Sequence, residues 1–230
     1  MAIRFDLYNS SLCFVNSHLA AHVEEVERRN QDYLDICNRL VFSTTFPSKS
    51  IKDHDQVFWI GDLNYRLSGD LDLLRVKELL DQNNHLALLQ YDQFRAQHAA
   101  RKIFIGYQEG PIQFRPSYKY DPGTDNWDTS EKNRAPAWCD RCLWKGDNVQ
   151  VKEYRSHPGL RKLGRRQNAN QVAGTRVHPA HQQVPRRPTT PHSHPRKAGF
   201  SVMFLASYAA LFAGVFSETT ITNFHDPRVS

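Results

Sequence analysis

"VFWIGDLNYRL", residues 57–67, is the stretch that decides the fold. Its first four residues are apolar, which predicts a short strand buried on both faces, and Gly61 lets the chain turn sharply where this strand ends. Asp62 and Asn64 follow at the carboxyl edge, where loops on a rigid scaffold commonly hold reactive groups. Their side chains point the same way in extended backbone and could activate a water beside an oxyanion. The alternative is an Asx-turn, in which both side chains bond their own backbone.

Three further motifs accompany this stretch: NSHL at residues 16–19, RPSYKYD at 115–121 and NRAPAWCDRCLWKG at 133–146. From about Ala2 to about Leu160, the chain resembles the inositol polyphosphate 5-phosphatases. This resemblance implies an α/β (α+β) fold of the endonuclease/exonuclease/phosphatase type, which is a sandwich of two mixed β-sheets flanked by helices. Here the sandwich is expected to be incomplete at both ends and to be followed by a disordered C-terminal tail.

The resemblance also implies catalytic roles. His18, at the end of a predicted strand, is expected to bond the scissile phosphate, and Asp62 to position or deprotonate the attacking water. Asn64 and His18 would stabilise the phosphoryl oxygens. Asp140 would orient His18, because a carboxylate raises the basicity of an imidazole and fixes its tautomer. Without the resemblance, a single histidine of this kind is more often structural or merely exposed.

Cations and hydroxyl donors near residues 115–141 suit an inositol ring that carries several phosphates. In the family, the positions matching Tyr118, Lys119 and Lys132 contact the 4-phosphate, and these contacts separate a 5-phosphatase from a nuclease of the same fold. Arg134 and Arg141 complete the expected substrate-binding set. Without the resemblance, the lysines would be interpreted as exposed residues on a loop.

The implied reaction is magnesium-dependent hydrolysis of the 5-phosphate of phosphatidylinositol 4,5-bisphosphate or of soluble inositol polyphosphates, at a membrane surface and without nucleic acid. The Glu and the terminal Asp that belong to the family's Mg²⁺ site have no counterpart in this sequence. No metal ligand is therefore assigned, and little or no activity is expected. A non-catalytic isoform that binds phosphoinositide is the alternative.

The charge of the chain is unevenly distributed. Its formal net charge is +6, yet ten Lys and Arg residues and no Asp or Glu fall between Tyr154 and Ser217. The basic excess therefore belongs to the tail, and net charge gives no argument for nucleic-acid binding. The hydrophobic content of 40% is sufficient for a folded core in the remainder.

The cysteines point to a reducing compartment. Four cysteines occur with no signal peptide ahead of them, which predicts reduced thiols in a cytoplasmic protein that is peripheral on membranes. Cys139 and Cys142 form a C-x-x-C pair, a spacing also used by zinc and redox sites. No second pair accompanies it, and the intervening Asp-Arg belongs to the phosphatase motif, so metal or redox use is not the favoured interpretation.

Hydrophobic periodicity predicts a hairpin over residues 2–15, an amphipathic helix over 20–42, helices over 73–82 and 86–100, and strands at 112–114 and 149–151. The Tyr91-Asp92-Gln93 run inside the last of these helices is interpreted as packing.

Three regions are expected: a partial catalytic domain at 1–160, a basic disordered linker at 161–198, and an apolar segment with the C-terminal tail at 199–230. The linker is poor in apolar residues, and its histidines lack metal-site spacing. The family's Ser-Asp-His motif does not follow Leu160, so the tail is interpreted as the product of an alternative exon or a shifted frame. Residues 199–217 are uncharged. They are barely long enough to span a bilayer, and a C-terminal anchor is the alternative to an accidental apolar run.

Overall fold

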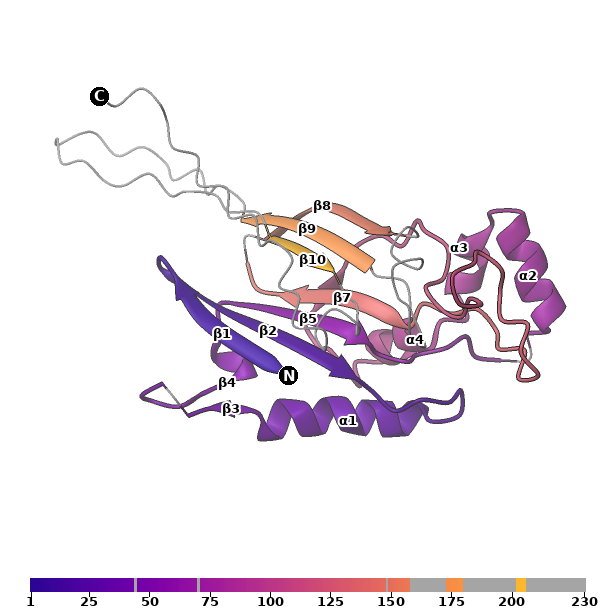
Figure 1. Ribbon diagram of the computed structural model, residues 1–230. Helices are drawn as coiled ribbons and strands as arrows, with labels where there is room; N and C mark the ends of the chain where they lie inside the picture. The colour runs from indigo at the N-terminus through magenta and orange to yellow at the C-terminus, as the bar shows by residue number, and fades with distance from the viewer. Residues whose placement is uncertain (44, 70, 148, 158–172, 180–201, 206–230) are drawn as a thin grey trace, which may run out of the picture.

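The computed structural model describes residues 1–157 apart from 44, 70 and 148, together with 173–179 and 202–205. Its centre is a mixed five-stranded sheet in the order β1-β2-β5-β7-β6 (Figure 1). The strands of this sheet are β1 (Ala2–Leu7), β2 (Ser10–His18), β5 (Gln56–Asp62), β7 (Asp140–Lys145) and β6 (Gln108–Glu109). The predicted hairpin is the antiparallel pair β1 and β2. β2 is parallel to β5, and β5 is antiparallel to β7.

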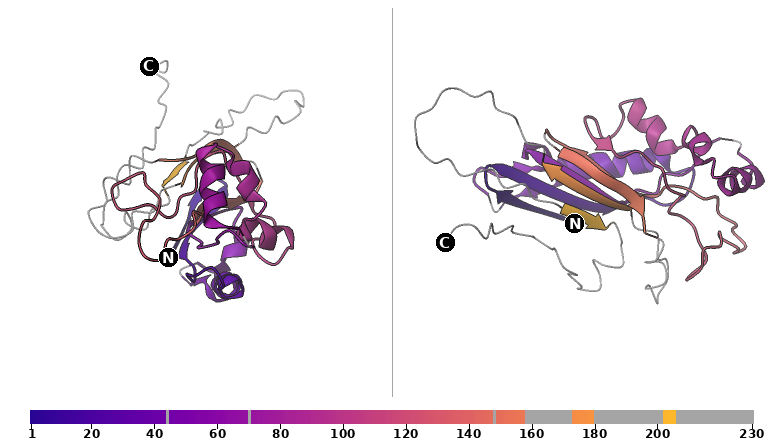
Figure 2. Two further views of the ribbon diagram at one scale, coloured as in Figure 1. Left: turned by 90° about the vertical axis from the view of Figure 1, so that its right-hand side faces the viewer. Right: turned by 90° about the horizontal axis from the view of Figure 1, so that it is seen from above.

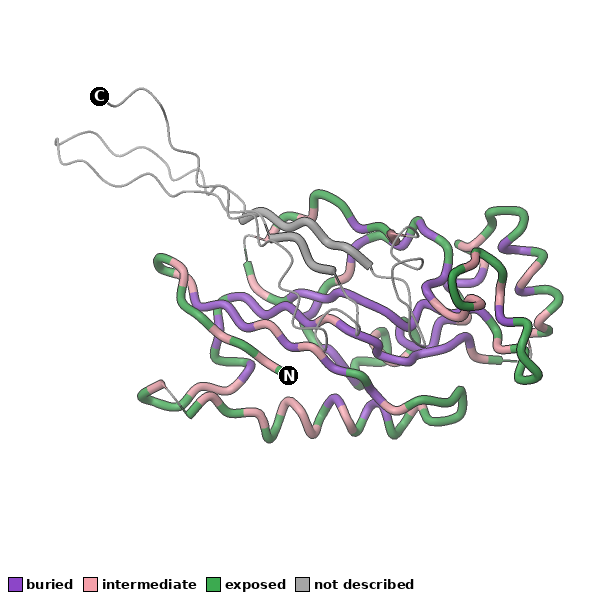
Figure 3. The backbone as a smooth tube through the Cα atoms, viewed as in Figure 1, coloured by how far each residue is buried: buried purple, intermediate pink, exposed green. Residues whose placement is uncertain are grey.

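The central strand β5 is buried on both faces, as predicted. Val57, Phe58 and Trp59 are each no more than 1% exposed. Phe58 packs into the apolar cluster on one face of the sheet, while Val57 and Trp59 pack into the cluster on the other face. Figure 3 shows this buried centre as the purple core of the tube. Burial on both sides explains why the strand is a continuous apolar run instead of an alternating pattern.

Gly61 is required where β5 lies against β2. Its φ is +131°, and a Cβ atom built at this position would lie 2.1 Å from the backbone oxygen of Ser17. Only glycine combines this backbone conformation with so close an approach of two chains. The residue therefore fixes how the ends of β2 and β5 meet.

Helix α1 (Val26–Arg39) covers one face of the sheet (Figures 1 and 2). The ring centroid of Tyr33 lies 5.2 Å from that of Trp59 and 4.1 Å from that of Phe104. The helix is shorter than the predicted 20–42 because the carbonyls of residues 20, 22 and 23 accept hydrogen bonds from the Arg29 guanidinium instead of continuing the helix.

Helices α2 (Leu73–Asp81) and α3 (His85–Leu89) lie beyond the end of the sheet at which β2 and β5 finish (Figure 1). Their buried leucines, Leu79, Leu80, Leu88 and Leu89, join the apolar cluster that contains Phe58. The predicted helix over 86–100 is wrong as a single element, since a separate helix α4 begins at Gln93 and ends at Ala99. The break occurs because Asp92 caps α4, accepting a hydrogen bond from the Arg95 N–H, and bridges to Leu67.

The expected strand at 112–114 is not formed. The Phe114 carbonyl instead accepts a hydrogen bond of 3.0 Å from the Trp138 indole. The strand expected at 149–151 is confirmed and extends further, as β8 (Val149–Ser156). The remaining short elements are β3 (Val41–Phe42), β4 (Lys49–Ser50) and the 3₁₀ turn Ile51–Asp53.

A second, three-stranded sheet has the order β10-β9-β8, with β9 at Ala173–Pro179 and β10 at Val202–Leu205. All of its pairings are antiparallel. β9 falls within the range expected to be disordered, so that expectation does not hold for these seven residues. The other residues of 161–198 and most of 199–217 lie outside the described part, and the expectations for them stay predictions. Over the residues that the structure describes, no helix is long and apolar enough to cross a membrane.

Candidate active site

Three polar side chains come together at the ends of three neighbouring strands. The register pairs His18 of β2 with Asp62 of β5, and it pairs Asp62 with Asp140 of β7. Neighbouring strands lie about 4.8 Å apart, so these residues form one row with Asp62 at its centre. The sequence predicted that these residues meet, and the structure brings them together.

His18 and Asp62 form the exposed side of the row. The Nε2 atom of His18 lies 3.6 Å from Oδ2 of Asp62. The histidine side chain is 41% exposed, whereas that of the aspartate is 5% exposed. The imidazole can therefore reach a ligand from solvent while a buried carboxylate lies behind it. Such a carboxylate orients the ring.

Asp140 lies on the far side of Asp62 from His18. This geometry corrects the expectation that Asp140 orients His18, because the neighbouring carboxylate of the histidine is that of Asp62. Asp140 is buried, and its Oδ2 atom has no hydrogen-bond partner among the residues that the structure describes. Burial, followed by the negative charge of Asp62, raises the pKa of the Asp140 carboxyl well above its usual value.

Asn64 holds the loop that follows His18. Its Nδ2 atom donates to the Leu19 carbonyl at 3.0 Å, and its Oδ1 accepts from Arg66 Nη2 at 2.6 Å. Its backbone N–H donates to Asp62 Oδ1 at 3.0 Å, which is the local bond of the Asx-turn alternative. The carboxamide is thus already used by protein partners, which differs from the expected contact with phosphoryl oxygens.

Arg66 is a site residue that the sequence interpretation missed. It is 8% exposed, and its guanidinium carbon lies 4.0 Å from the centre of the Tyr118 ring. It also bonds the Asn64 carbonyl through Nε at 3.1 Å. The signal was its place in the 57–67 stretch, two residues after Asn64. This cation links the carboxylate row to the loop expected to bind substrate.

The expected substrate loop is organised around one buried carboxylate. Asp128 is 1% exposed and accepts hydrogen bonds from the backbone and side chain of Arg134 at 3.0 and 3.2 Å. Lys119 Nζ lies 4.0 Å from its other oxygen. Burial alone would raise the pKa of Asp128, but the hydrogen bonds from Arg134 and Ser130 lower it to about 2. The charged carboxylate therefore fixes two of the expected cations.

The remaining expected substrate residues lie at the two ends of this loop. Tyr118 pairs through backbone hydrogen bonds with Ala137, which brings the loop beside β7. Lys132 is exposed, and the next residue, Asn133, accepts a hydrogen bond of 3.3 Å from Lys77 of α2. Helix α2 thereby supports the tip of the loop.

Arg141 does not reach the surface. Its side chain is fully buried, it is paired with Asp92, and its Nη1 lies 3.0 Å from Glu109 Oε2. The expectation that Arg141 binds substrate is therefore corrected, because its charge is already balanced inside the protein. The alternation of strand β7 explains the error: Asp140 and Arg141 are adjacent in sequence but point to opposite faces.

The described residues are expected to provide no metal ligand, and this expectation stays a prediction. Within them, no group of three or more His, Cys, Asp or Glu side chains is arranged to hold a metal ion. Asp62 already bonds Asn64 through Oδ1 and approaches His18 through Oδ2. A divalent ion prefers several oxygen ligands, so here it would need ligands from beyond these residues. Cys139 and Cys142 are buried thiols, and burial raises the pKa of Cys139, which opposes the thiolate form that metals bind.

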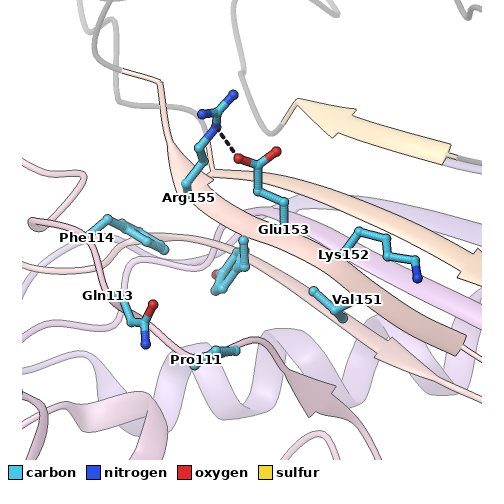
Figure 4. Close-up of a pocket in the computed structure, with 8 residues that line it drawn as sticks. Pro111, Gln113, Phe114, Val151, Lys152, Glu153 and Arg155 are labelled. Carbon is cyan, nitrogen blue, oxygen red and sulfur yellow. Dashed lines mark ion pairs between the residues drawn. The ribbon is translucent and has the colours of Figure 1, made fainter.

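A groove of about 450 Å³ lies between β8 and residues 111–114 (Figure 4). Lys152, Glu153 and Arg155 line it from β8, and the last two form an ion pair of 2.9 Å. None of the expected site residues lines this groove. The candidate site is therefore the carboxylate row, not this groove.

Sequence and structure comparisons converge on one group of proteins. The family described as Endonuclease/Exonuclease/phosphatase family 2 matches residues 1–162. The type II inositol 1,4,5-trisphosphate 5-phosphatase of Mus musculus is 56% identical over 164 residues, which are 70% of this chain and 16% of that protein. The polyphosphatidylinositol phosphatase INP53 of Saccharomyces cerevisiae is 42% identical over 69% of this chain and 14% of its own length. The chain thus spans less than a fifth of the length of these relatives.

Solved structures agree. The chain superposes on the inositol polyphosphate 5-phosphatase domain of a synaptojanin, in complex with inositol (1,4)-bisphosphate and a calcium ion, with a TM-score of 0.64 and 42% identity. The match covers 68% of this chain and 45% of that domain. A Cimex nitrophorin in its ferrous NO complex is also similar, with a TM-score of 0.53 and 30% identity over 70% of this chain and 54% of that one. Similar folds thus occur in proteins with quite different ligands.

Proposed function

Because the chain belongs to the inositol polyphosphate 5-phosphatase family, we propose that residues 1–160 are part of a catalytic domain that hydrolyses a 5-phosphate. The substrates would be phosphatidylinositol 4,5-bisphosphate at a membrane surface or soluble inositol polyphosphates. A cytoplasmic, peripheral location accords with such substrates. We further propose that β8, β9 and β10 represent the second sheet of the sandwich. The observation that carries the proposal is the row of His18, Asp62 and Asp140, with a cation-bearing loop beside it.

Each member of the row has a distinct task in this proposal. Asp62 would accept the proton of the attacking water, because its carboxyl group lies directly behind the exposed imidazole. His18 would donate a ring N–H to a phosphoryl oxygen from the exposed side of the imidazole. Asp140, whose carboxyl has a pKa raised by burial and by Asp62, would limit the negative charge of the row. Asn64 would act through its bond to Leu19, by holding the loop of His18 in place.

The loop around Asp128 would bind the phosphate next to the scissile one. Lys119 and Arg134 are fixed by Asp128, and Lys132 is exposed at the loop tip, so three cations can surround a dianion. Tyr118, held by the Arg66 guanidinium, would offer its hydroxyl. Arg141 would support β7 from inside instead of touching the ligand.

Bound Mg²⁺ would supply electrostatic stabilisation of the phosphoryl oxygens, as in other metal-assisted phosphate hydrolysis. Since the described residues are expected to provide no metal ligand, we propose that this chain hydrolyses phosphate weakly. The test is Mg²⁺-dependent phosphate release from vesicles that contain phosphatidylinositol 4,5-bisphosphate, with the mouse type II catalytic domain as the positive control.

We expect a rate at least about 100-fold below that control, since loss of one transition-state contact typically costs that much. The remaining rate should fall further in Asp62→Asn. A rate comparable with that of the control would contradict the proposal that this chain hydrolyses phosphate weakly. A residual rate that is unchanged in both Asp62→Asn and His18→Ala would contradict the site.

A non-catalytic phosphoinositide-binding protein is the second candidate. One observation favours it: Lys119 and Arg134 are both held by Asp128, which is not a member of the carboxylate row. Binding to the same vesicles without phosphate release, weakened in Lys119→Ala and Lys132→Ala, would identify this function. Lys152→Ala is the matched control, because Lys152 lies in the groove beside β8.

A further inference from the structure

A buried hydrogen-bond network joins the segment that follows His18 to the segment that follows Asp62. Its members are Arg29 of α1, which has no exposed surface, and Gln93 at the start of α4, which is 5% exposed. Neither residue belongs to the carboxylate row or to the substrate loop. Buried polar groups of this kind are costly unless satisfied, so their partners indicate what they hold in place.

Arg29 holds the segment that follows His18. Its guanidinium donates to the carbonyls of Ala20, His22 and Val23. It also donates to Gln93 Oε1 at 2.8 Å. These acceptors are all neutral oxygens, so the buried cation is balanced by carbonyl dipoles. Residues 20–23 are thereby fixed to α1.

Gln93 connects this segment to the one that follows Asp62. Its Nε2 donates to the Val23 carbonyl at 2.9 Å, while its Oε1 also accepts from the Arg66 N–H at 2.9 Å. The Gln93 backbone N–H donates to the Arg66 carbonyl at 2.9 Å. One carboxamide therefore bonds both loops, which requires a donor and an acceptor on the same side chain.

The connection continues to the catalytic row. The guanidinium of Arg66 bonds Asn64, and Asn64 bonds the carbonyl of Leu19. The Leu19 N–H in turn donates to the Asp62 carbonyl at 3.0 Å. His18 and Asp62 are thus held at their relative positions by a closed circuit of hydrogen bonds in which Gln93 is the only side chain from α4.

We infer that Gln93 is a positioning residue, which couples the His18 loop to the Asp62–Arg66 segment and uses Arg29 as its anchor. This inference rests on the proposed function, because the coupled groups are those proposed to bind and hydrolyse the phosphate. A residue of this kind acts through the geometry of its neighbours and does not touch the ligand.

The test compares Gln93→Leu with Gln97→Leu in the full chain. Gln97 lies one turn further along α4, and its Oε1 accepts from Asn30 Nδ2 at 2.9 Å, away from both loops. Both variants remove a carboxamide from the same helix, but only the Gln93 side chain bonds the segments that follow His18 and Asp62. Two quantities are measured: amide hydrogen exchange at Ala20 and Arg66, and affinity for inositol 1,4-bisphosphate by calorimetry.

We expect Gln93→Leu to speed exchange at both amides and to weaken inositol 1,4-bisphosphate binding, each by about tenfold, because loss of one hydrogen bond commonly corresponds to such a factor. Gln97→Leu should change neither by more than about twofold. Equal effects of the two variants, or wild-type exchange in Gln93→Leu, would overturn the inference. Faster exchange in Gln93→Leu, with no binding even by the wild-type chain, would support the coupling and count against the proposed function.

If Gln93→Leu does not fold, Gln93→Glu provides a second test of the hydrogen bonds of this side chain. The carboxylate retains the acceptor for Arg29 and the Arg66 N–H but has no donor for the Val23 carbonyl. The Ala20 N–H donates to Asp32 Oδ2 at 3.0 Å, so its exchange reports opening of residues 20–23 as a segment. This exchange should rise when Val23 loses its donor, while the Arg66 amide stays protected. Unchanged exchange at Ala20 would contradict the assigned role of Nε2.

Discussion

Asp62 and Asp140 lie directly opposite each other across β5 and β7, so two buried carboxyl groups share one end of the sheet. Burial and this neighbour raise the pKa of Asp140 above 3.8, the value of an ordinary aspartate. A raised pKa in the folded state means that the stabilising contribution is present below the unfolded value and is lost as the pH rises through the folded value. The contribution of Asp140 to stability should therefore decrease as the pH rises above 3.8.

Asp140→Asn should consequently gain stability relative to the wild type as the pH increases from 4 to 8. The expected gain is about 1 kcal/mol or more, since one pKa unit corresponds to about 1.4 kcal/mol. Urea unfolding at several pH values measures it. Asp147→Asn is the control, because Asp147 is exposed. If the stability difference between Asp140→Asn and the wild type does not change with pH, the pKa of the Asp140 carboxyl is not raised in the folded protein.

Asp128 should behave in the opposite way. Its pKa is lowered to about 2, so its contribution to stability is present above the unfolded value of 3.8 and is lost as the pH falls from about 4 to 2. Asp128→Asn should cost on the order of 2 kcal/mol at neutral pH and little at pH 2. Thermal unfolding across this range measures the effect, with Glu131→Gln, a change of an exposed carboxylate in the same loop, as the control. If Asp128→Asn loses as much stability at pH 2 as at neutral pH, the lowered pKa of Asp128 is contradicted.

Gly61 and Gly123 offer a matched pair of substitutions to alanine. Both have positive φ, but a Cβ at Gly61 would collide with the Ser17 carbonyl, whereas nothing lies within 4 Å at Gly123. Gly61→Ala should cost about 3 kcal/mol or more, because the backbone of β2 must move, and Gly123→Ala should cost about 1 kcal/mol from backbone strain alone. Chemical denaturation distinguishes them. Equal costs would mean that the close approach of β2 and β5 is not obligatory.

Substitution of Arg141 should reduce the stability of the fold, whereas substitution of Lys132 should reduce only the affinity for ligand. Arg141→Met leaves Asp92 and Glu109 as buried carboxylates without their cation, which should destabilise the fold by about 3–5 kcal/mol. Lys132→Ala removes an exposed cation and should leave the midpoint of unfolding nearly unchanged while weakening inositol 1,4-bisphosphate binding. Denaturation and calorimetry on both variants measure this. A stable Arg141→Met variant with impaired binding would restore the original expectation of direct contact.

Much of the fold could be predicted from local pattern. The apolar run of β5, the β1–β2 hairpin and the amphipathic helix over α1 follow from hydrophobic periodicity, and all three are present. The single helix expected over 86–100 failed because Asp92 caps a new helix while bridging to Leu67. That bridge is a tertiary contact, and no local pattern reports it.

The composition of the candidate site could be predicted, but its internal partners could not. The motifs identified His18, Asp62 and Asp140, whereas the pairing of His18 with Asp62 depends on β5 lying between β2 and β7. Strand order is a property of the whole sheet. Arg66 was overlooked because its role arises only when the Tyr118 loop packs over it.

The central claim is that His18 and Asp62 face one phosphate-binding position. The most direct test is NMR of the histidine ring signals of the full chain during titration with inositol 1,4-bisphosphate, with His18→Ala used to assign the signal. We predict a saturable shift of the His18 signal that is lost in Lys132→Ala and altered in Asp62→Asn. A titration in which the His18 signal stays in place while other histidines shift would contradict the account.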